Sequence, residues 1–324
     1  MSAGRASPAA AARGAAEAAE AARVHVDGRD RLGECALWCE RGQALYWTDI
    51  DSHRLFRWRA EASPTREAGG PALAGEITEW PMPEPLGSFA LCDQPGQLLL
   101  GLASGVAMFD LATGEVGPLT PVEADEPRTR INDGRCDPQG RFVFGMFNPH
   151  GAAVGGYYRA AMAGVGIGRG LAIERLPLPP GIVGNSLNFS PDGGTLYYTD
   201  SPTRTIWAMD YHADGRLGER RVFAQLPMDG GEPDGAAVDA DGGLWSAIWG
   251  DGVVIRFDAQ GRETLRLSVP ASQPTCPVFG GPALDRLFVT TARRQCEHEP
   301  LAGALFELDP HGHRGQVPHR FNTR

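Results

Sequence analysis

The sequence predicts an all-β protein folded as a six-bladed β-propeller. Three observations support this prediction: one turn-and-strand phrase recurs along the chain, Gly- and Pro-rich turns separate short apolar runs, and hardly any window shows helical periodicity. This turn-and-strand pattern occurs six times, at intervals near 48 residues. Sharing about 300 residues among six units leaves roughly 50 for each, which is the size of a four-stranded propeller blade.

Each copy of the phrase consists of a polar turn followed by a run rich in aromatic and β-branched residues. One apolar residue in each run serves as an anchor, and the six anchors are Leu45, Leu98, Phe142, Leu196, Leu244 and Leu287, spaced by 53, 44, 54, 48 and 43 residues. A further strand-like segment follows each anchor, at residues 54–58, 105–110, 156–159, 205–210, 253–258 and 304–309. A pair of β-sandwiches would not explain the regular period, and an eight-stranded barrel would need a shorter one. A closed ring of blades also protects the strand edges from unwanted pairing.

Composition and charge limit the partners of the protein. The chain has 324 residues, 42% of them hydrophobic, which is enough for a large core, and its formal net charge is −10. We expect no nucleic-acid partner because no basic patch stands out, and no membrane partner because no run approaches the roughly 18 apolar residues of a membrane span. We expect a monomer or a weak homo-oligomer that acts on a small molecule.

The first 23 residues differ in composition from the rest of the chain. They are almost all Ala, Arg, Glu, Gly and Ser, so we expect a disordered Ala-rich tail at residues 1–23 and a single propeller domain at residues 24–324. The tail lacks the apolar core of a secretory signal. None of the six cysteines belongs to a C-x-x-C pair, so we expect reduced thiols and a cytoplasmic protein.

Four polar residues stand at one position of the repeat. Glu34 and Asn185 lie 11 residues before their anchors, whereas Asn132 and Asp234 lie 10 residues before theirs. In a propeller this position falls where the innermost strand of a blade begins, at one mouth of the central channel. Each residue alone is typical of a turn, but the shared position brings two carboxylates and two amide oxygens together. Such hard oxygen donors suit one divalent metal ion, namely Ca²⁺, Mg²⁺ or Mn²⁺, with Zn²⁺ as a further alternative.

These residues belong to longer motifs that follow one another along the chain. The motifs include Leu32-Gly-Glu34, Arg130-Ile-Asn-Asp-Gly134, Gly184-Asn-Ser186, Pro233-Asp-Gly235 and Leu287-Phe-Val-Thr-Thr-Ala292. Together they resemble the SMP-30/gluconolactonase/LRE-like family of six-bladed propeller lactonases over residues 30–320. The sequences of these motifs are most similar to those of the bacterial L-arabinonolactonase branch of the family. The resemblance implies that Glu34, Asn185 and Asp234 hold a divalent metal ion. It also implies that Arg130 and Asn132 contact the substrate.

Two stretches depart from the family pattern. Ala36 stands where the family usually has a proline, two residues after the metal-binding glutamate. After Gly145 the chain reads Met-Phe-Asn-Pro-His150, where many relatives have Thr-Met and some carry a substrate-binding acid further on. His150 is the candidate to replace that substrate contact, and an ordinary loop histidine is the alternative. Asp200 is expected to cap a turn, with lining of the pocket together with Ser201 as its alternative.

The predicted function is metal-dependent hydrolysis of a sugar-acid (aldono-) lactone to the free aldonic acid by a carboxylic-ester hydrolase of carbohydrate metabolism. The expected substrate is L-arabinono-1,4-lactone or a related pentono- or hexonolactone. The ion would polarise the lactone carbonyl, and Asp234 would act as general base for the attacking water, with hydroxide held by the metal as the alternative. The rival functions are a gluconolactonase or a paraoxonase-like esterase on the same scaffold, and a non-enzymatic calcium-binding propeller.

Overall fold

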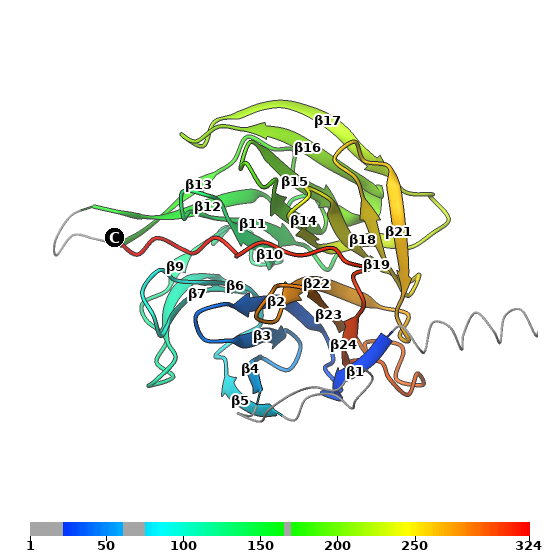
Figure 1. The fold of residues 1–324 in the computed structure, drawn as a ribbon. Coiled ribbons are helices and arrows are strands. Elements are labelled where there is room, and N and C mark those ends of the chain that lie inside the picture. Colours follow the sequence, from blue (N-terminus) through cyan, green and yellow to red (C-terminus); the bar gives the residue numbers. More distant parts are fainter. Residues whose placement is uncertain (1–21, 61–74, 165–169) are drawn as a thin grey trace, which may run out of the picture.

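Six four-stranded antiparallel sheets form a ring in the computed structural model, which describes residues 22–60, 75–164 and 170–324 (Figure 1). This arrangement confirms the predicted all-β, six-bladed propeller. From the inner strand outward, the first three blades are β2 (Gly33–Cys39), β3 (Ala44–Asp49), β4 (Arg54–Ala60) and β5 (Gly75–Pro81); β6 (Leu86–Leu91), β7 (Gln97–Leu102), β8 (Gly105–Asp110) and β9 (Thr120–Pro121); and β10 (Arg130–Cys136), β11 (Phe142–Phe147), β12 (Tyr157–Ala163) and β13 (Gly170–Arg175). The last three are β14 (Gly184–Phe189), β15 (Thr195–Asp200), β16 (Thr205–Tyr211) and β17 (Leu217–Gln225); β18 (Glu232–Val238), β19 (Leu244–Trp249), β20 (Val253–Phe257) and β21 (Glu263–Ser268); and β22 (Pro274–Gly280), β23 (Arg286–Thr291), β24 (Leu305–Leu308) and β1 (Ala22–Val26).

Each copy of the sequence repeat corresponds to the second strand of one blade. All six anchors lie in these strands and have no exposed surface. The second strands are almost wholly buried because neighbouring blades cover both of their faces, and the apolar clusters accordingly join adjacent blades. Leu37 and Phe89, for example, pack in one cluster, and Trp245 and Phe306 pack in another. The strand-like segments expected after the anchors are the third strands of the blades.

The first described strand closes the ring. β1 pairs antiparallel with β24 and so becomes the outer strand of the last blade, which joins the two ends of the propeller. Because β1 begins at Ala22, Ala22 and Arg23 belong to the propeller and not to the tail to which the sequence analysis assigned them. The remaining tail residues, 1–21, lie outside the described residues.

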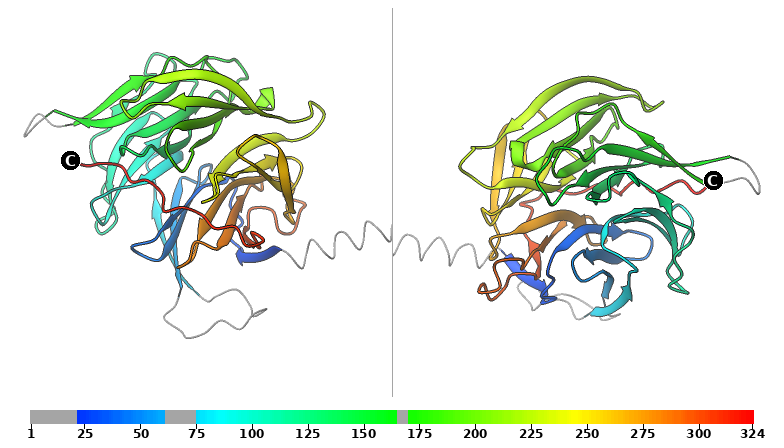
Figure 2. Two further views of the ribbon diagram at one scale, coloured as in Figure 1. Left: turned by 45° about the horizontal axis from the view of Figure 1, so that its top comes forward. Right: turned by 180° about the vertical axis from the view of Figure 1, so that it is seen from behind.

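The two mouths of the central channel differ. The inner strands contact one another in the order β2, β6, β10, β14, β18, β22 and back to β2. After β24 the chain crosses the mouth at the ends of these strands, as the red segment in Figures 1 and 2 shows. There it encloses a cavity of about 80 Å³ and buries Phe321, whose N–H donates to Leu91 O at 2.8 Å. The strands begin at the opposite mouth, which is where the sequence analysis placed the site.

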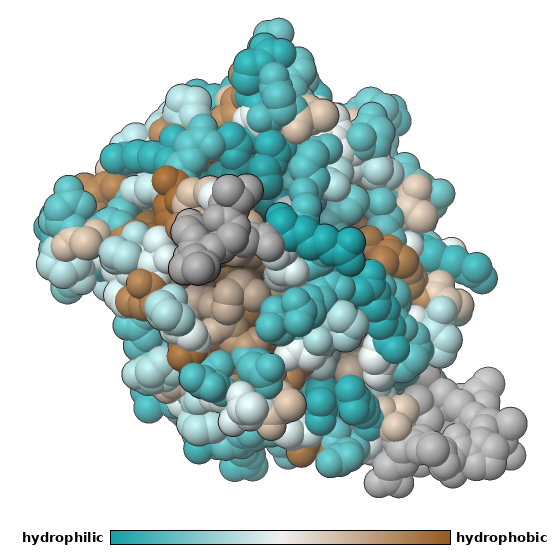
Figure 3. Space-filling model, turned by 90° about the vertical axis from the view of Figure 1, so that its left-hand side faces the viewer, coloured by the Kyte–Doolittle hydropathy of each residue, from teal (hydrophilic) through white to brown (hydrophobic). Residues whose placement is uncertain are grey.

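No helix among the described residues is long and apolar enough to cross a membrane. The face shown in Figure 3 is mostly hydrophilic, with hydrophobic residues gathered only in small separate patches. All six cysteines are buried and free.

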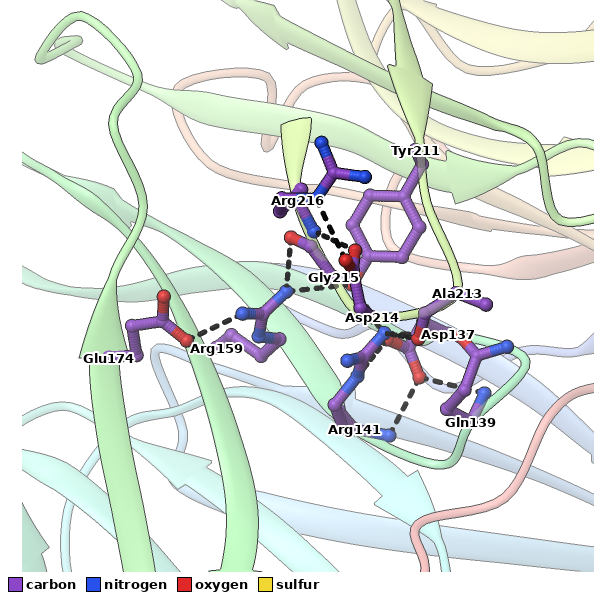
Figure 4. A network of polar contacts seen from close by, with 10 residues as sticks. All are labelled: Asp137, Gln139, Arg141, Arg159, Glu174, Tyr211, Ala213, Asp214, Gly215 and Arg216. Atoms are coloured by element: carbon purple, nitrogen blue, oxygen red, sulfur yellow. Dashed lines mark hydrogen bonds and ion pairs between the residues drawn. The ribbon is translucent and has the colours of Figure 1, made fainter. Parts of the chain in front are cut away.

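A buried polar network fastens the third blade to the fourth (Figure 4). Asp137 follows β10 and has no exposed surface, and its Oδ2 accepts a hydrogen bond from the hydroxyl of Tyr211 in β16 at 2.6 Å. Arg141 completes the charge balance through an ion pair with the same carboxylate. Arg159 of β12 reaches the fourth blade as well, because its NH1 donates to Gly215 O at 2.7 Å. These contacts join the two blades beyond the end of β10, at the opposite end of that strand from Arg130.

Asp30 is a buried carboxyl group at the junction where the ring closes. Its backbone N–H donates to Gly303 O at 2.8 Å, and its Oδ2 accepts a hydrogen bond from Trp47 Nε1 at 2.9 Å. Burial, helped by the nearby charge of Asp49, raises the pKa of Asp30 from 3.8 to about 8. The folded protein therefore keeps a proton that the unfolded chain loses at a much lower pH.

Since the pKa of Asp30 is raised, its share of stability is complete below about pH 4 and is lost as the pH rises towards 8. Asp30→Asn keeps an acceptor for Trp47 but cannot ionise. The free energy of unfolding of the wild type should therefore fall, relative to the variant, by up to about 1.4 kcal/mol for each pH unit between about 5 and 8. Urea unfolding of both proteins across this range measures the difference. A difference that stays constant with pH would contradict the prediction.

Candidate active site

A cavity of about 160 Å³ lies where the inner strands begin. It is lined by five of the predicted site residues, Glu34, Arg130, Asn132, Asn185 and Asp234. The sixth, His150, lies exposed in the turn after β11 and is not among the lining residues. The geometry therefore gives no support to the expected substrate contact of His150.

A β-bulge re-aims the chain at the start of each inner strand. The register between the first two strands of a blade shifts directly after Glu34 in β2 and Asn185 in β14. In β10 and β18 the shift falls at Asn132 and Asp234 themselves. The residues after Glu34 and Asn185 adopt left-handed backbone angles, with φ of 48° at Cys35 and 54° at Ser186. The four polar residues thus lie in strand bulges, which direct side chains where regular pleating would not.

The carboxyl groups of Glu34 and Asp234 both line the cavity and lie close enough to influence each other's pKa. Burial, helped by the charge of Asp133, raises the pKa of Glu34 from 4.5 to about 8. Burial and the charge of Glu34 raise the pKa of Asp234 well above its usual value. Two neighbouring buried carboxylates do not both stay ionised without a cation between them, so the pair retains a proton at neutral pH.

Asp133 is a third buried carboxylate in the channel, but its oxygens are already occupied. Oδ1 accepts a hydrogen bond from Gly134 N at 2.8 Å, and Oδ2 accepts one from Leu187 N at 3.0 Å. Asp133 does not line the cavity. Its position ties β10 to β14 and marks it as structural.

The residues present fit a divalent metal ion. Across residues 22–60, 75–164 and 170–324, no three His, Cys, Asp or Glu side chains gather as a metal-binding group, so the third ligand would be a neutral oxygen. Asn185 supplies one: its Nδ2 donates to Ser201 Oγ at 3.0 Å, and its Oδ1 accepts from Asn132 Nδ2 at 2.9 Å and keeps a second lone pair. Two carboxylates and an amide oxygen are hard donors, and a cation would replace the proton that Glu34 and Asp234 share.

Arg130 contributes a fixed positive charge beside this group. Its guanidinium stacks over Phe147, 4.7 Å from the ring centre, and its NH1 donates to Asn132 Oδ1 at 2.8 Å. Burial lowers the pKa of Arg130 to about 10, with the charges of Glu34 and other acids opposing the shift. Arg130 therefore remains protonated at neutral pH.

The sequence analysis missed several lining residues. Phe147 and Trp249 each lie five residues after an anchor, at the end of a second strand, so the same repeat counted downstream would have found them. Ser201, which the sequence analysis named as a pocket-lining alternative, has the same spacing from its anchor and lines the cavity, whereas Asp200 does not. Second strands run antiparallel to inner strands and therefore end at the mouth where inner strands begin. The other lining residues are Leu32, Val183, Glu232, Pro233 and Arg294. Asp200 caps the chain as expected, because its Oδ1 accepts the N–H groups of residues 182 and 183.

Comparisons with known proteins find similarity along most of the chain. A family model described as the SMP-30/gluconolactonase/LRE-like region matches residues 32–293, which include every lining residue of the cavity except Arg294. The chain is 43% identical to an L-arabinolactonase of Azospirillum brasilense, over 93% of this chain and 95% of that protein. It is 33% identical to a 6-deoxy-6-sulfogluconolactonase of Pseudomonas putida, over 85% of this chain and 90% of that protein. The structure of a calcium-binding regucalcin from Agrobacterium tumefaciens superposes with a TM-score of 0.80 at 29% identity, covering 93% of this chain and 97% of that one.

The carboxyl pair should cost the metal-free protein stability. Asp234→Asn removes one of two facing acids and lets an amide donate to Glu34, so the metal-free variant should melt at the same temperature as the wild type or higher. The rise in melting temperature that divalent cations give the wild type should be lost in the variant. Thermal melting with a chelator and then with added Ca²⁺ or Mn²⁺ measures both effects.

Asp133→Asn is the matched control, because it also neutralises a buried acid of the channel. An amide cannot accept both backbone N–H groups, so this variant should lose about 1–3 kcal/mol of stability in the chelator. An equal loss in Asp234→Asn would show that Glu34 and Asp234 do not oppose folding.

Proposed function

The chain belongs to the SMP-30/gluconolactonase/LRE-like family, and from this membership we propose that it hydrolyses a sugar-acid lactone to the free aldonic acid with the help of a divalent metal ion. It is a carboxylic-ester hydrolase that opens lactones. The observation that carries the proposal is the buried pair Glu34 and Asp234, placed with the amide oxygen of Asn185 in one cavity beside Arg130.

The proposed substrate is L-arabinono-1,4-lactone or a closely related pentono- or hexonolactone. Similarity to the L-arabinolactonase of Azospirillum brasilense supports this choice. The cavity suits a polyol, because Arg130 and Asn132 offer hydrogen-bonding groups while Phe147 and Trp249 offer aromatic surface to the C–H face of a sugar ring. An entirely apolar substrate, as expected for a paraoxonase-like esterase, would leave these polar groups without partners.

Glu34, Asp234 and Asn185 would hold the metal ion. When bound, a divalent cation polarises a carbonyl, stabilises negative charge on its oxygen and favours the ionised form of nearby carboxylates. Asp234 in its ionised form is the proposed general base: a carboxylate oxygen takes a proton from the water that attacks the lactone carbonyl carbon. The same proton then passes to the ring oxygen as its bond to the carbonyl carbon breaks, which leaves the carboxylic acid and a hydroxyl group.

Arg130 is placed to assist this reaction. Its NH1 serves Asn132 and the backbone O of Ile131, whereas no hydrogen bond to described residues involves its Nε or NH2. These atoms would donate to a ring hydroxyl or to the developing oxyanion. The stacking on Phe147 limits the motion of the guanidinium, so little orientation entropy is lost when the substrate binds.

Asp234→Asn should lower kcat for lactone hydrolysis by at least about 10²-fold, because the amide cannot accept the proton of water. Acid release from L-arabinono-1,4-lactone, followed with a pH indicator and corrected for spontaneous opening, measures the change. Asp258→Asn is the control: this acid lies in the turn after β20, outside the cavity, and its loss should leave kcat unchanged. Undiminished turnover in Asp234→Asn would refute the assigned base.

Metal removal tests the cofactor separately. Exhaustive chelation should abolish hydrolysis, and readdition of Ca²⁺, Mg²⁺, Mn²⁺ or Zn²⁺ should restore it. The ion with the highest affinity for the protein should restore activity at the lowest concentration. Full activity in protein that elemental analysis shows to be metal-free would rule the cofactor out.

A panel of lactones tests the substrate. It adds D-xylono-, D-galactono- and D-gluconolactone to L-arabinono-1,4-lactone, and a higher kcat/KM for gluconolactone than for the arabinonolactone would favour the gluconolactonase alternative.

A further inference from the structure

A continuous chain of four hydrogen bonds crosses the cavity wall. Arg130 NH1 donates to Asn132 Oδ1 at 2.8 Å, and Asn132 Nδ2 donates to Asn185 Oδ1 at 2.9 Å. Asn185 Nδ2 then donates to Ser201 Oγ at 3.0 Å, and the hydroxyl of Ser201 donates to the backbone O of Pro233 at 2.7 Å. The chain of bonds runs from β10 through β14 and the end of β15 to β18, and so joins three blades.

The chemistry of its two ends fixes the direction of this chain. A guanidinium can only donate hydrogen bonds, and a backbone carbonyl can only accept them. Each side chain between the ends must therefore accept from the side of Arg130 and donate towards Pro233. The backbone O of Gly184 enforces the same direction, because it accepts a second bond from Asn132 Nδ2 at 3.2 Å. The orientation of both amides follows from these end groups.

Orientation matters most for Asn185. The two ends of its amide have nearly the same shape, but the oxygen attracts a cation and the NH₂ group repels one. The side chain is only 4% exposed, so water cannot easily replace a lost partner. With Nδ2 engaged by Ser201, the oxygen is the end left to accept a ligand.

We propose that Ser201, acting in series with Arg130 and Asn132, is a positioning residue that locks the amide of Asn185 so that its oxygen is offered to the cation held by Glu34 and Asp234. This inference rests on the proposed function. It gives Arg130 and Asn132 a second task besides substrate contact, namely fixing a metal ligand from the opposite side.

The backbone holds Ser201 firmly for this task. It opens a short 3-10 turn, Ser201–Thr203, and its N–H donates to Val183 O at 3.0 Å. Val183 lies just before β14, so the turn is fastened to the strand that carries Asn185. Only 4% of Ser201 is exposed. Its hydroxyl links this blade to the next one by donating to the backbone O of Pro233, the residue before Asp234. Ser201 thereby sets the position of two ligands relative to each other.

The test is the dissociation constant of Ca²⁺ or Mn²⁺ for the metal-free protein, measured by calorimetric titration. Ser201→Ala should weaken binding by about 10- to 100-fold, as expected for loss of a partner that orients a metal ligand. Thr291→Val is the matched control. Its hydroxyl is as deeply buried and donates to the backbone O of Ala304 at 2.6 Å, but it is not part of the chain of bonds. This control should bind the cation as the wild type does.

A double-mutant cycle separates orientation from general damage. Asn185→Asp replaces the amide by a carboxylate, which presents oxygen in either orientation and needs no orienting partner. In that background Ser201→Ala should change the dissociation constant by no more than about twofold. An equal weakening in both backgrounds, or none in the native one, would overturn the proposal. If Ser201→Ala does not fold, Asn132→Ala breaks the same chain on the other side of Asn185 and should give the same pattern.

The outcomes also distinguish this inference from the proposed function. A wild type that binds no divalent cation would refute the metal-dependent function and the positioning role together. A wild type that binds the cation and hydrolyses the lactone, with no change of affinity in Ser201→Ala or Asn132→Ala, would refute the positioning role alone.

Discussion

The contact between the carboxyl groups of Glu34 and Asp234 is the interaction on which the rest of the site depends, because two acids can be buried side by side only with a proton or a cation between them. The scaffold must be stable enough to hold them there. That stability comes from parts of the protein far from the site. The second strands of the blades are buried, β1 closes the ring, and polar networks such as the one at Asp137 join neighbouring blades. The unfavourable pair is therefore tolerated at the one mouth where a ligand can relieve it.

The bulges explain how one repeated unit produces different side-chain directions. Register shifts occur at the start of all six inner strands, yet only four blades place a carboxylate or amide beside the cavity. In β22 the corresponding bulge holds Thr275, whose hydroxyl donates to Gly33 O at 2.5 Å and joins the last blade to the first. In β6 it holds Gly87, where an added Cβ would lie 2.0 Å from Ile131 O. Two blades thus use the bulge for packing, and four place a polar side chain there beside the cavity.

The architecture, and the gathering of four candidate residues at one cavity, could be predicted from the sequence because both follow the repeat. Leu45 and its five counterparts are spaced regularly, and residues at a fixed offset from them share one end of the channel. Phe147 and Trp249 obey the same rule at another offset, so they could have been predicted in the same way. Arg294 was not, because it follows no strand end at a repeated spacing and reaches the cavity only through the path of the chain after β23. His150 shows the opposite limit: a motif position suggested a contact, but the residue is exposed in a turn and does not line the cavity.

A repeat can give the position of a residue but not the direction of its hydrogen bonds. The sequence places Asn132 and Asn185 at one level of the channel, where both amides are equally plausible ligands for a cation. Only the three-dimensional connection shows that Arg130 donates at one end and that Pro233 accepts at the other. The oxygen of Asn132 therefore accepts from a positively charged guanidinium, which repels a cation, whereas the oxygen of Asn185 accepts from a neutral amide. In the proposed mechanism, the different tasks of these two like side chains, one towards the substrate and one towards the metal ion, follow from this difference in their donors.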